Sequence, residues 1–116
     1  MAPYPQPRPR HLRNGQAYVP KEFREKRLEL QAHMIRLTAG SSLLQGPLAV
    51  EIGFFRPKKR DRRKDGDVDN YMKAVLDAGN AVLWVDDRQI VDLHGYLDDN
   101  ADEGRVELVI GAPACP

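Results

Sequence analysis

Hydrophobic side chains alternate with polar or small residues between positions 48 and 55. A period of two is typical of a strand that buries one face, because successive side chains of a strand point to opposite sides. We therefore predict a strand over residues 48–55, the clearest in the sequence. The residues expected on its buried face are Leu48, Val50, Ile52 and Phe54.

Two other segments carry apolar residues at the three- and four-residue spacing of a helix. The first runs from about Lys21 to Thr38 and starts at Pro20, which suits the first helical position. The second begins near Val68 and ends at Gly79-Asn80, a pair typical of a helix C-terminus. The expected apolar residues are Phe23, Leu28, Leu30, Met34, Ile35 and Leu37 in the first helix, and Val68, Met72, Val75, Leu76 and Gly79 in the second.

The pattern after the second helix predicts three more strands. Residues 81–85 are interpreted as a short buried strand, and residues 89–97 and 105–111 as two strands that enclose an acidic loop, residues 98–104. The order of elements indicates an α+β fold of two layers, with a mixed or antiparallel sheet covered by helices mainly on one face. A chain of 116 residues has room for one modest core, so we expect a single domain over residues 1–116.

The composition is that of an ordinary soluble protein, with 41% hydrophobic and 30% charged residues. No apolar run approaches the roughly 18 residues of a membrane span, and the first residues lack the apolar stretch of a secretory signal. Cys115 is the single cysteine and cannot form an internal disulfide, which fits a reducing compartment. These features predict a cytoplasmic protein.

The net charge of +1 conceals two halves of opposite sign. Residues 1–64 contain 15 Lys or Arg against 5 Asp or Glu, whereas residues 65–116 contain 3 against 12. The basic residues are concentrated in a Pro-rich arm, residues 1–19, and in a loop, residues 56–66, that we expect to be too charged to pack. Such clusters are typical of nucleic-acid binding, although solvated segments without a partner also contain them. The predicted DNA contacts are Arg8, Arg10, Lys58, Lys59, Arg60, Arg62, Arg63 and Lys64.

Acidic residues follow the basic loop directly. Asp67 and Asp69 are two positions apart, so an extended backbone would turn both side chains to the same side. Lys73 lies one helical turn after Asp69, and Asp86 and Asp87 follow the strand predicted over residues 81–85. Oxygen ligands from separate elements suit a hard divalent cation that keeps coordination positions open for substrate and water.

Each of these residues also has a purely structural interpretation. Asp67 and Asp69 could cap the second helix, and Asp86 and Asp87 could form a turn between strands. Lys73 could be a surface lysine paired with an acid at helical spacing, either Asp69 or Asp77. Their occurrence together, beside a basic segment, favours phosphodiester chemistry, because the acids alone would repel a polyanion.

The spacing of these residues resembles the signature of the RusA family of Holliday junction resolvases. The series is Asp67-x-Asp69-Asn70-x-x-Lys73, then Leu76-Asp77-Ala78, then Trp84-Val85-Asp86-Asp87-x-Gln89-x-x-Asp92. Upstream, Arg8-Pro9-Arg10, Tyr18-Val19-Pro20 and the helix after them are also similar to the family's amino-terminal part. Family members usually open with an apolar strand, which this chain lacks. The sheet is therefore expected to be one strand short, or residues 2–6 pair as a proline-interrupted edge.

The resemblance implies a magnesium-dependent endonuclease, in which manganese can substitute, that resolves four-way DNA junctions by paired nicks in recombination and repair. It implies that Asp67, Asp69 and Asp87 bind the cation and that Lys73 is needed for cleavage, so these four are the predicted catalytic residues. It also implies a homodimer, which would match the approximate two-fold symmetry of a junction. The interpretation depends on the three carboxylates meeting around one ion.

Two alternatives to a junction resolvase stay open. The first is a DNA-binding protein without catalysis, in which the acids bind a structural cation or only cap the helix. The second is a nuclease that cuts other branched DNA such as flaps or forks, because metal chemistry specifies phosphodiester hydrolysis far better than it specifies the shape of the DNA.

Overall fold

The strand β3 (Leu48–Pro57) is the centre of a mixed sheet of three strands in the order β4-β3-β5. The computed structural model describes residues 1–6, 10, 11, 17, 18, 20–39 and 41–114. β3 pairs in parallel with β4 (Ile90–Ala101) and antiparallel with β5 (Arg105–Gly111). The predicted α+β fold with a mixed sheet is confirmed.

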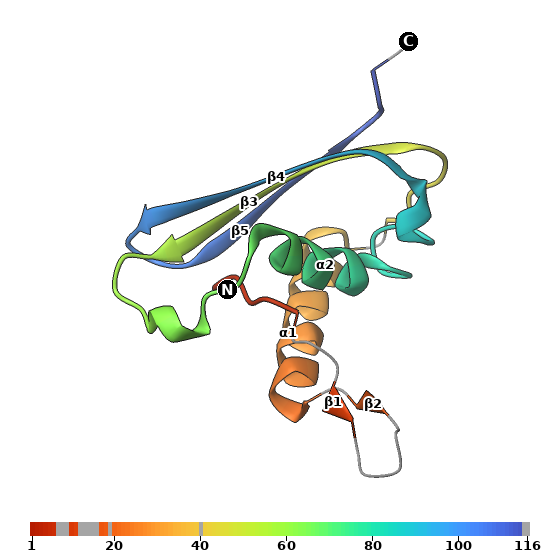
Figure 1. Ribbon diagram of the computed structural model, residues 1–116. Coiled ribbons are helices and arrows are strands. Elements are labelled where there is room, and N and C mark those ends of the chain that lie inside the picture. The colour runs from red at the N-terminus through yellow and green to blue at the C-terminus, as the bar shows by residue number, and fades with distance from the viewer. Residues whose placement is uncertain (7–9, 12–16, 19, 40, 115–116) are drawn as a thin grey trace.

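Two helices lie on one face of this sheet, and the other face is uncovered (Figure 1). They are α1 (Lys21–Leu37) and α2 (Val68–Gly79). The four residues predicted on the buried face of β3 are buried, so this prediction is confirmed. The helices contribute the rest of the layer between sheet and helices, chiefly Phe23, Leu30, Met34, Tyr71, Ala74, Val75 and Ala78.

The apolar face of α1 is narrower than the sequence predicts. Pro20 is the N-cap, and the helix begins at the next residue. Phe23, Leu30 and Met34 are buried as expected. The prediction is wrong for the other three residues of the apolar face, because only one stripe of α1 contacts the sheet and α2. These exposed residues are Leu28, Ile35 and Leu37.

The chain turns sharply after α2, and residues 81–85 form no strand. Trp84 is fully buried and folds back onto Gly79, where an added Cβ would lie 2.5 Å from the indole ring. The Leu83 amide donates to the Gly79 carbonyl at 2.8 Å, and the Trp84 indole donates to the Asn80 side chain at 2.9 Å. The predicted strand is therefore wrong, because Leu83 and Trp84 of its apolar run are buried within a turn. Gly79 allows the close approach of Trp84, and the left-handed residue of the turn is Ala81, with φ of 60°.

β4 extends farther than the sequence predicts. Residues 98–101, expected in an acidic loop, continue the strand, and only residues 102–104 connect β4 to β5. The side chains of Val106, Leu108 and Ile110 in β5 pack against the core, as expected for one face of a strand. The loop prediction fails because pairing with β3 and an ion pair at Asp99 stabilise the acidic residues within the strand.

The amino-terminal residues do not extend the sheet. Residues 1–6 form no strand, and the backbone amide of Gln6 donates to the carbonyl of Asn70 at 3.0 Å. β1 (Arg10–His11) and β2 (Ala17–Tyr18) pair with each other and, among the described residues, with no strand of the main sheet. The predicted sheet edge over residues 2–6 is therefore wrong, and Arg8 and Cys115 lie outside the described residues. Every helix in the described part of the chain is too short or too polar to cross a bilayer.

Candidate functional site

The start of α2 presents two of the predicted carboxylates to solvent. Asp67 is the N-cap residue, and Asp69 lies in the first turn. Both side chains are exposed, and that of Asp67 makes no capping hydrogen bond. The helix already begins at Val68, so the extended backbone predicted for the pair is wrong. The two carboxylates nevertheless share the positive end of α2 and are available to bind a cation.

Lys73 lies one turn after Asp69 on the exposed surface of α2. Within the described residues its ammonium group forms no ion pair with Asp69, with Asp77 or with any other acid. The interpretation of Lys73 as a surface lysine paired along the helix is therefore not supported. Its charge is available to a phosphate approaching the start of α2.

Asp86 and Asp87 introduce the short 3-10 helix η2 (Asp87–Gln89). The Asp86 carboxylate accepts a hydrogen bond from the backbone amide of Arg88 at 2.9 Å, which lowers the pKa of Asp86 below its ordinary value. The Gln89 side chain in turn accepts from the Asp86 amide at 3.0 Å, completing a capping box. Asp87 instead accepts from the side-chain amide of Asn80 at 3.4 Å. The turn interpretation thus holds for Asp86, and Asp87 lies beside the end of α2.

The predicted ligands therefore lie at opposite ends of α2. α2 has 12 residues and is about 18 Å long, because a helix rises about 1.5 Å per residue. Asp67 precedes its first residue, and Asn80, the partner of Asp87, follows its last. Oxygen ligands of a single magnesium ion each lie only about 2.1 Å from it. Among the residues that the structure describes, no three His, Cys, Asp or Glu side chains are grouped so that they could hold a metal.

Within the described residues of one chain, Asp67, Asp69 and Asp87 therefore do not meet around one ion, and their shared role as ligands stays a prediction. The physical reason is the connection between parallel strands. A chain that leaves the end of β3 must return along the sheet before β4 can begin, and α2 makes that return. The acids before and after α2 are consequently delivered to opposite ends of the sheet.

Two arginines of the basic segment are packed against carboxylates. The Nε and Nη2 atoms of Arg56 donate to the two oxygens of Asp99 at 2.5 and 2.8 Å. Arg60 binds both oxygens of Asp65 at 2.9 Å and approaches Asp99 at 3.4 Å. The arginine side chains are only 12% and 10% exposed. The expectation that residues 56–66 are too charged to pack is thus wrong for Arg56 and Arg60, because each gains a bidentate acidic partner.

This network holds the residues that precede Asp67. The Arg56 guanidinium reaches the Gly66 carbonyl at 3.5 Å and lies 5.7 Å from the centre of the Tyr71 ring. The Gly66 amide donates to the Tyr71 hydroxyl at 3.2 Å. The contacts of Arg56 and Tyr71 with Gly66 therefore hold the start of α2 against the ends of β3 and β4.

The carboxyl groups of Asp65 and Asp99 have pKa values below the ordinary value. The largest cause is the hydrogen bond from Arg60 for Asp65 and from Arg56 for Asp99. No local pattern indicated the Arg56–Asp99 pair, because 43 positions separate the two residues and no local spacing relates them. For the Arg60–Asp65 pair, the one signal in the sequence was the position of Asp65 directly after the basic run.

The other basic residues of this segment are exposed. Lys58 pairs with Asp102 at 3.6 Å, and Arg63 pairs with Asp61 at 3.0 Å. Three more make no ion pair within the described residues, namely Lys59, Arg62 and Lys64. Of Arg10 only the backbone is described. Five of the eight predicted DNA contacts therefore present exposed cations in the segment before α2, whereas the guanidinium of Arg60 is paired with two carboxylates.

Two comparisons with known proteins bear on this arrangement. A family model described as "RusA: Endodeoxyribonuclease RusA" matches residues 1–111, which include α2 and both pairs of acids. A protein of Bacillus subtilis (strain 168), named "Uncharacterized protein YqaN", is 29% identical over 127 residues, which cover 93% of this chain and 89% of that protein.

Proposed function

Since the chain belongs to the Endodeoxyribonuclease RusA family, a family of DNA-cleaving enzymes, we propose that it is a divalent-cation-dependent endonuclease that resolves four-way DNA junctions by paired nicks. The observation that carries this proposal is the exposed set at the start of α2. Two exposed carboxylates, Asp67 and Asp69, directly follow a segment of exposed cations, and Lys73, one helical turn after Asp69, forms no ion pair in the part of the chain that the structure describes. Acids that bind a cation and bases that bind phosphates are both required for cutting a polyanion.

The donor chemistry of this set fits magnesium or manganese, because both prefer oxygen ligands and exposed carboxylates supply them. Asp67 and Asp69 would hold the cation, which when bound polarises the scissile phosphate and activates water. Lys73 stabilises the extra negative charge of the transition state or orients the nucleophile. The exposed cations between Lys58 and Lys64 bind the DNA backbone without reading sequence.

Asp87 enters this scheme through a second copy of the chain. Because about 18 Å of helix separates it from Asp67, it joins a ligand set only when another protomer brings its own Asp87 to the start of α2. A two-fold symmetric homodimer would then contain two equivalent sites, one for each of two opposed strands of a junction. The exposed apolar side chains Leu28, Ile35 and Leu37 of α1 offer surface for contact between the copies.

The first test compares DNA substrates. The protein is incubated with an end-labelled four-way junction, a flap and a linear duplex of the same sequence, with magnesium, with manganese and with EDTA. We expect paired nicks in the junction, and none in EDTA. A protein that binds the junction but never nicks it would contradict catalysis, and preferential cutting of the flap would contradict the junction as substrate.

The second test asks whether one site draws on two protomers. Asp69→Asn and Asp87→Asn are each expected to abolish cutting. Mixed dimers are formed by refolding the two variants together, and each contains one intact site if Asp87 acts in the partner's site. Nicking and manganese binding, the latter measured by calorimetry, should then return to about half of the parent value per mixed dimer. If each site used acids of one chain only, both sites of the mixed dimer would stay defective, and neither signal would return.

A further inference from the structure

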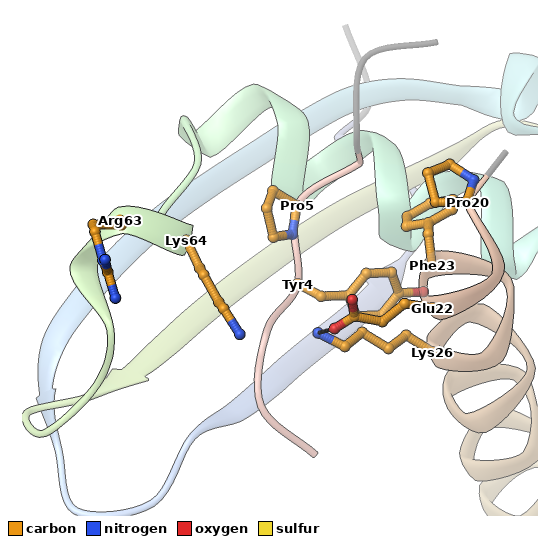
Figure 2. Close-up of a pocket in the computed structure, with 8 residues that line it drawn as sticks. All are labelled: Tyr4, Pro5, Pro20, Glu22, Phe23, Lys26, Arg63 and Lys64. Carbon is orange, nitrogen blue, oxygen red and sulfur yellow. Dashed lines mark ion pairs between the residues drawn. The ribbon is translucent and has the colours of Figure 1, made fainter. Parts of the chain in front are cut away.

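A pocket of about 470 Å³ lies between the amino-terminal segment, the start of α1 and the 3-10 helix η1 (Arg62–Lys64) (Figure 2). Tyr4, Pro5 and Phe23 provide its apolar wall, and Lys26, Arg63 and Lys64 provide its cations. The volume falls within the range of about 300 to 1,000 Å³ that is usual for ligand sites. A phosphate group with part of its sugar fits into such a space.

The charges around this pocket are mainly positive. Among the described residues that line it, Glu22 alone is acidic, and it pairs with Lys26 at 3.6 Å on an exposed helix surface, where ion pairs are weak. Lys64 forms no ion pair within the described part of the chain. In Figure 2 the side chains of Lys64 and Lys26 extend toward one another from the two sides of the amino-terminal segment. An anion bound between them would be attracted by both ammonium groups.

The pocket adjoins the start of α2. Gly66, one residue before Asp67, packs so closely on Pro5 that an added Cβ would lie 2.5 Å from the proline ring. The Gln6 amide donates to the carbonyl of Asn70, the residue after Asp69. The segment that forms one wall of the pocket is therefore in direct contact with the turn that carries the two carboxylates. A DNA strand bound at those carboxylates has a short path to the pocket.

We propose that this pocket binds a phosphodiester group of the DNA strand next to the cleavage site, and that Lys26 of α1 is its anchor. The inference rests on the proposed nuclease function and adds α1, a helix in which the sequence predicts no DNA contact, to the DNA-binding surface. The contact fixes the position of the strand and carries no sequence information, because a phosphate is the same at every step of the chain.

The test measures junction binding in EDTA, so that no cutting occurs, over a series of salt concentrations. Lys26→Ala should weaken binding by about three- to tenfold and reduce the slope of log affinity against log salt by about one, the value for one lost phosphate contact. Lys21→Ala is the matched control. Lys21 is also on α1 and also pairs with a glutamate four residues away, at 3.8 Å, but it lies outside the pocket. Its removal should leave the slope unchanged.

Lys26→Glu provides a second variant, which should weaken binding further than Lys26→Ala. The proposal is wrong if Lys26→Ala and Lys21→Ala bind the junction with the same affinity and slope as the parent protein. That outcome leaves the nuclease proposal intact, provided that the parent protein cuts the junction with magnesium. A parent protein that neither binds nor cuts any junction contradicts both.

Discussion

The guanidinium of Arg56 and the carboxylate of Asp99 form a bidentate ion pair that joins the end of β3 to the end of β4. Both residues lie in strands that run in parallel, so the pair locks neighbouring strand ends at the point where the chain leaves for α2. Arg56 also contacts Gly66 and Tyr71. The position of the exposed carboxylates at the start of α2 therefore depends on an interaction at the edge of the sheet.

Asp99→Asn should destabilise the protein by about 1 to 2 kcal/mol, because it replaces a charge-assisted bidentate contact to a mostly buried arginine. It should also raise the magnesium concentration needed for half-maximal cutting, because the turn before Asp67 loses part of its support. Urea unfolding and a magnesium titration measure the two effects. Glu107→Gln is the control: its pair with Arg105 is half-exposed, so a change of more than about 0.5 kcal/mol would contradict this account.

Stability should fall in acid through Asp65 and Asp99. Their pKa values are lower in the folded protein than the roughly 3.9 of an unfolded aspartate, so the unfolded state binds more protons. Their contribution is therefore present above about pH 4 and is lost as the pH falls through the folded pKa values. Unfolding free energies measured between pH 7 and pH 2 should decline more steeply in the parent protein than in the double variant Asp65→Asn, Asp99→Asn. Parallel curves would show that these two ion pairs do not contribute.

Asp69→Asn should bind junctions as tightly as the parent protein and cut them at least about 100-fold more slowly, because a cation ligand contributes several kcal/mol to the transition state. A gel shift and a cleavage assay with the same labelled junction measure both properties. Asp77→Asn, two turns farther along α2, is the control and should keep its activity. Full activity of Asp69→Asn would remove this residue from the mechanism.

Lys73→Ala should also slow cutting while the protein stays folded, because the ammonium is exposed and unpaired within the described residues. The expected loss is about 100-fold at saturating DNA, with little change of the melting temperature. Lys73→Arg keeps the charge and should recover part of the activity. Equal rates of cutting by the alanine variant and the parent protein would show that Lys73 has no role in cleavage.

Gly79→Ala should destabilise the fold by about 1 to 3 kcal/mol, since the added methyl group meets the buried Trp84 ring at 2.5 Å. Gly111→Ala is the matched control, because among the described residues, its two chain neighbours aside, no atom lies within 4 Å of a Cβ at that position. Chemical denaturation of the two variants measures the difference. If both variants were equally stable, Gly79 would not be needed for the packing of Trp84.

The local patterns of the sequence determined the main elements. Alternation over residues 48–55 identified β3 and its buried side chains, and helical spacing identified α1 and α2, because periodicity reflects which face of an element is buried. The spaced acids and Lys73 identified the family that the comparison then confirmed over residues 1–111. These features are encoded within short stretches of chain.

Tertiary structure decided how those stretches meet. The apolar run of residues 81–85 has strand-like composition, but Trp84 folds onto Gly79 and is fully buried there. Arg56 and Asp99 come together because parallel pairing aligns the ends of β3 and β4. The same parallel pairing requires the chain to return along the sheet through α2, and it therefore separates Asp67 from Asp87. Spacing along a chain reveals which residues carry chemistry, whereas the path of the backbone determines whether they share a site within one chain.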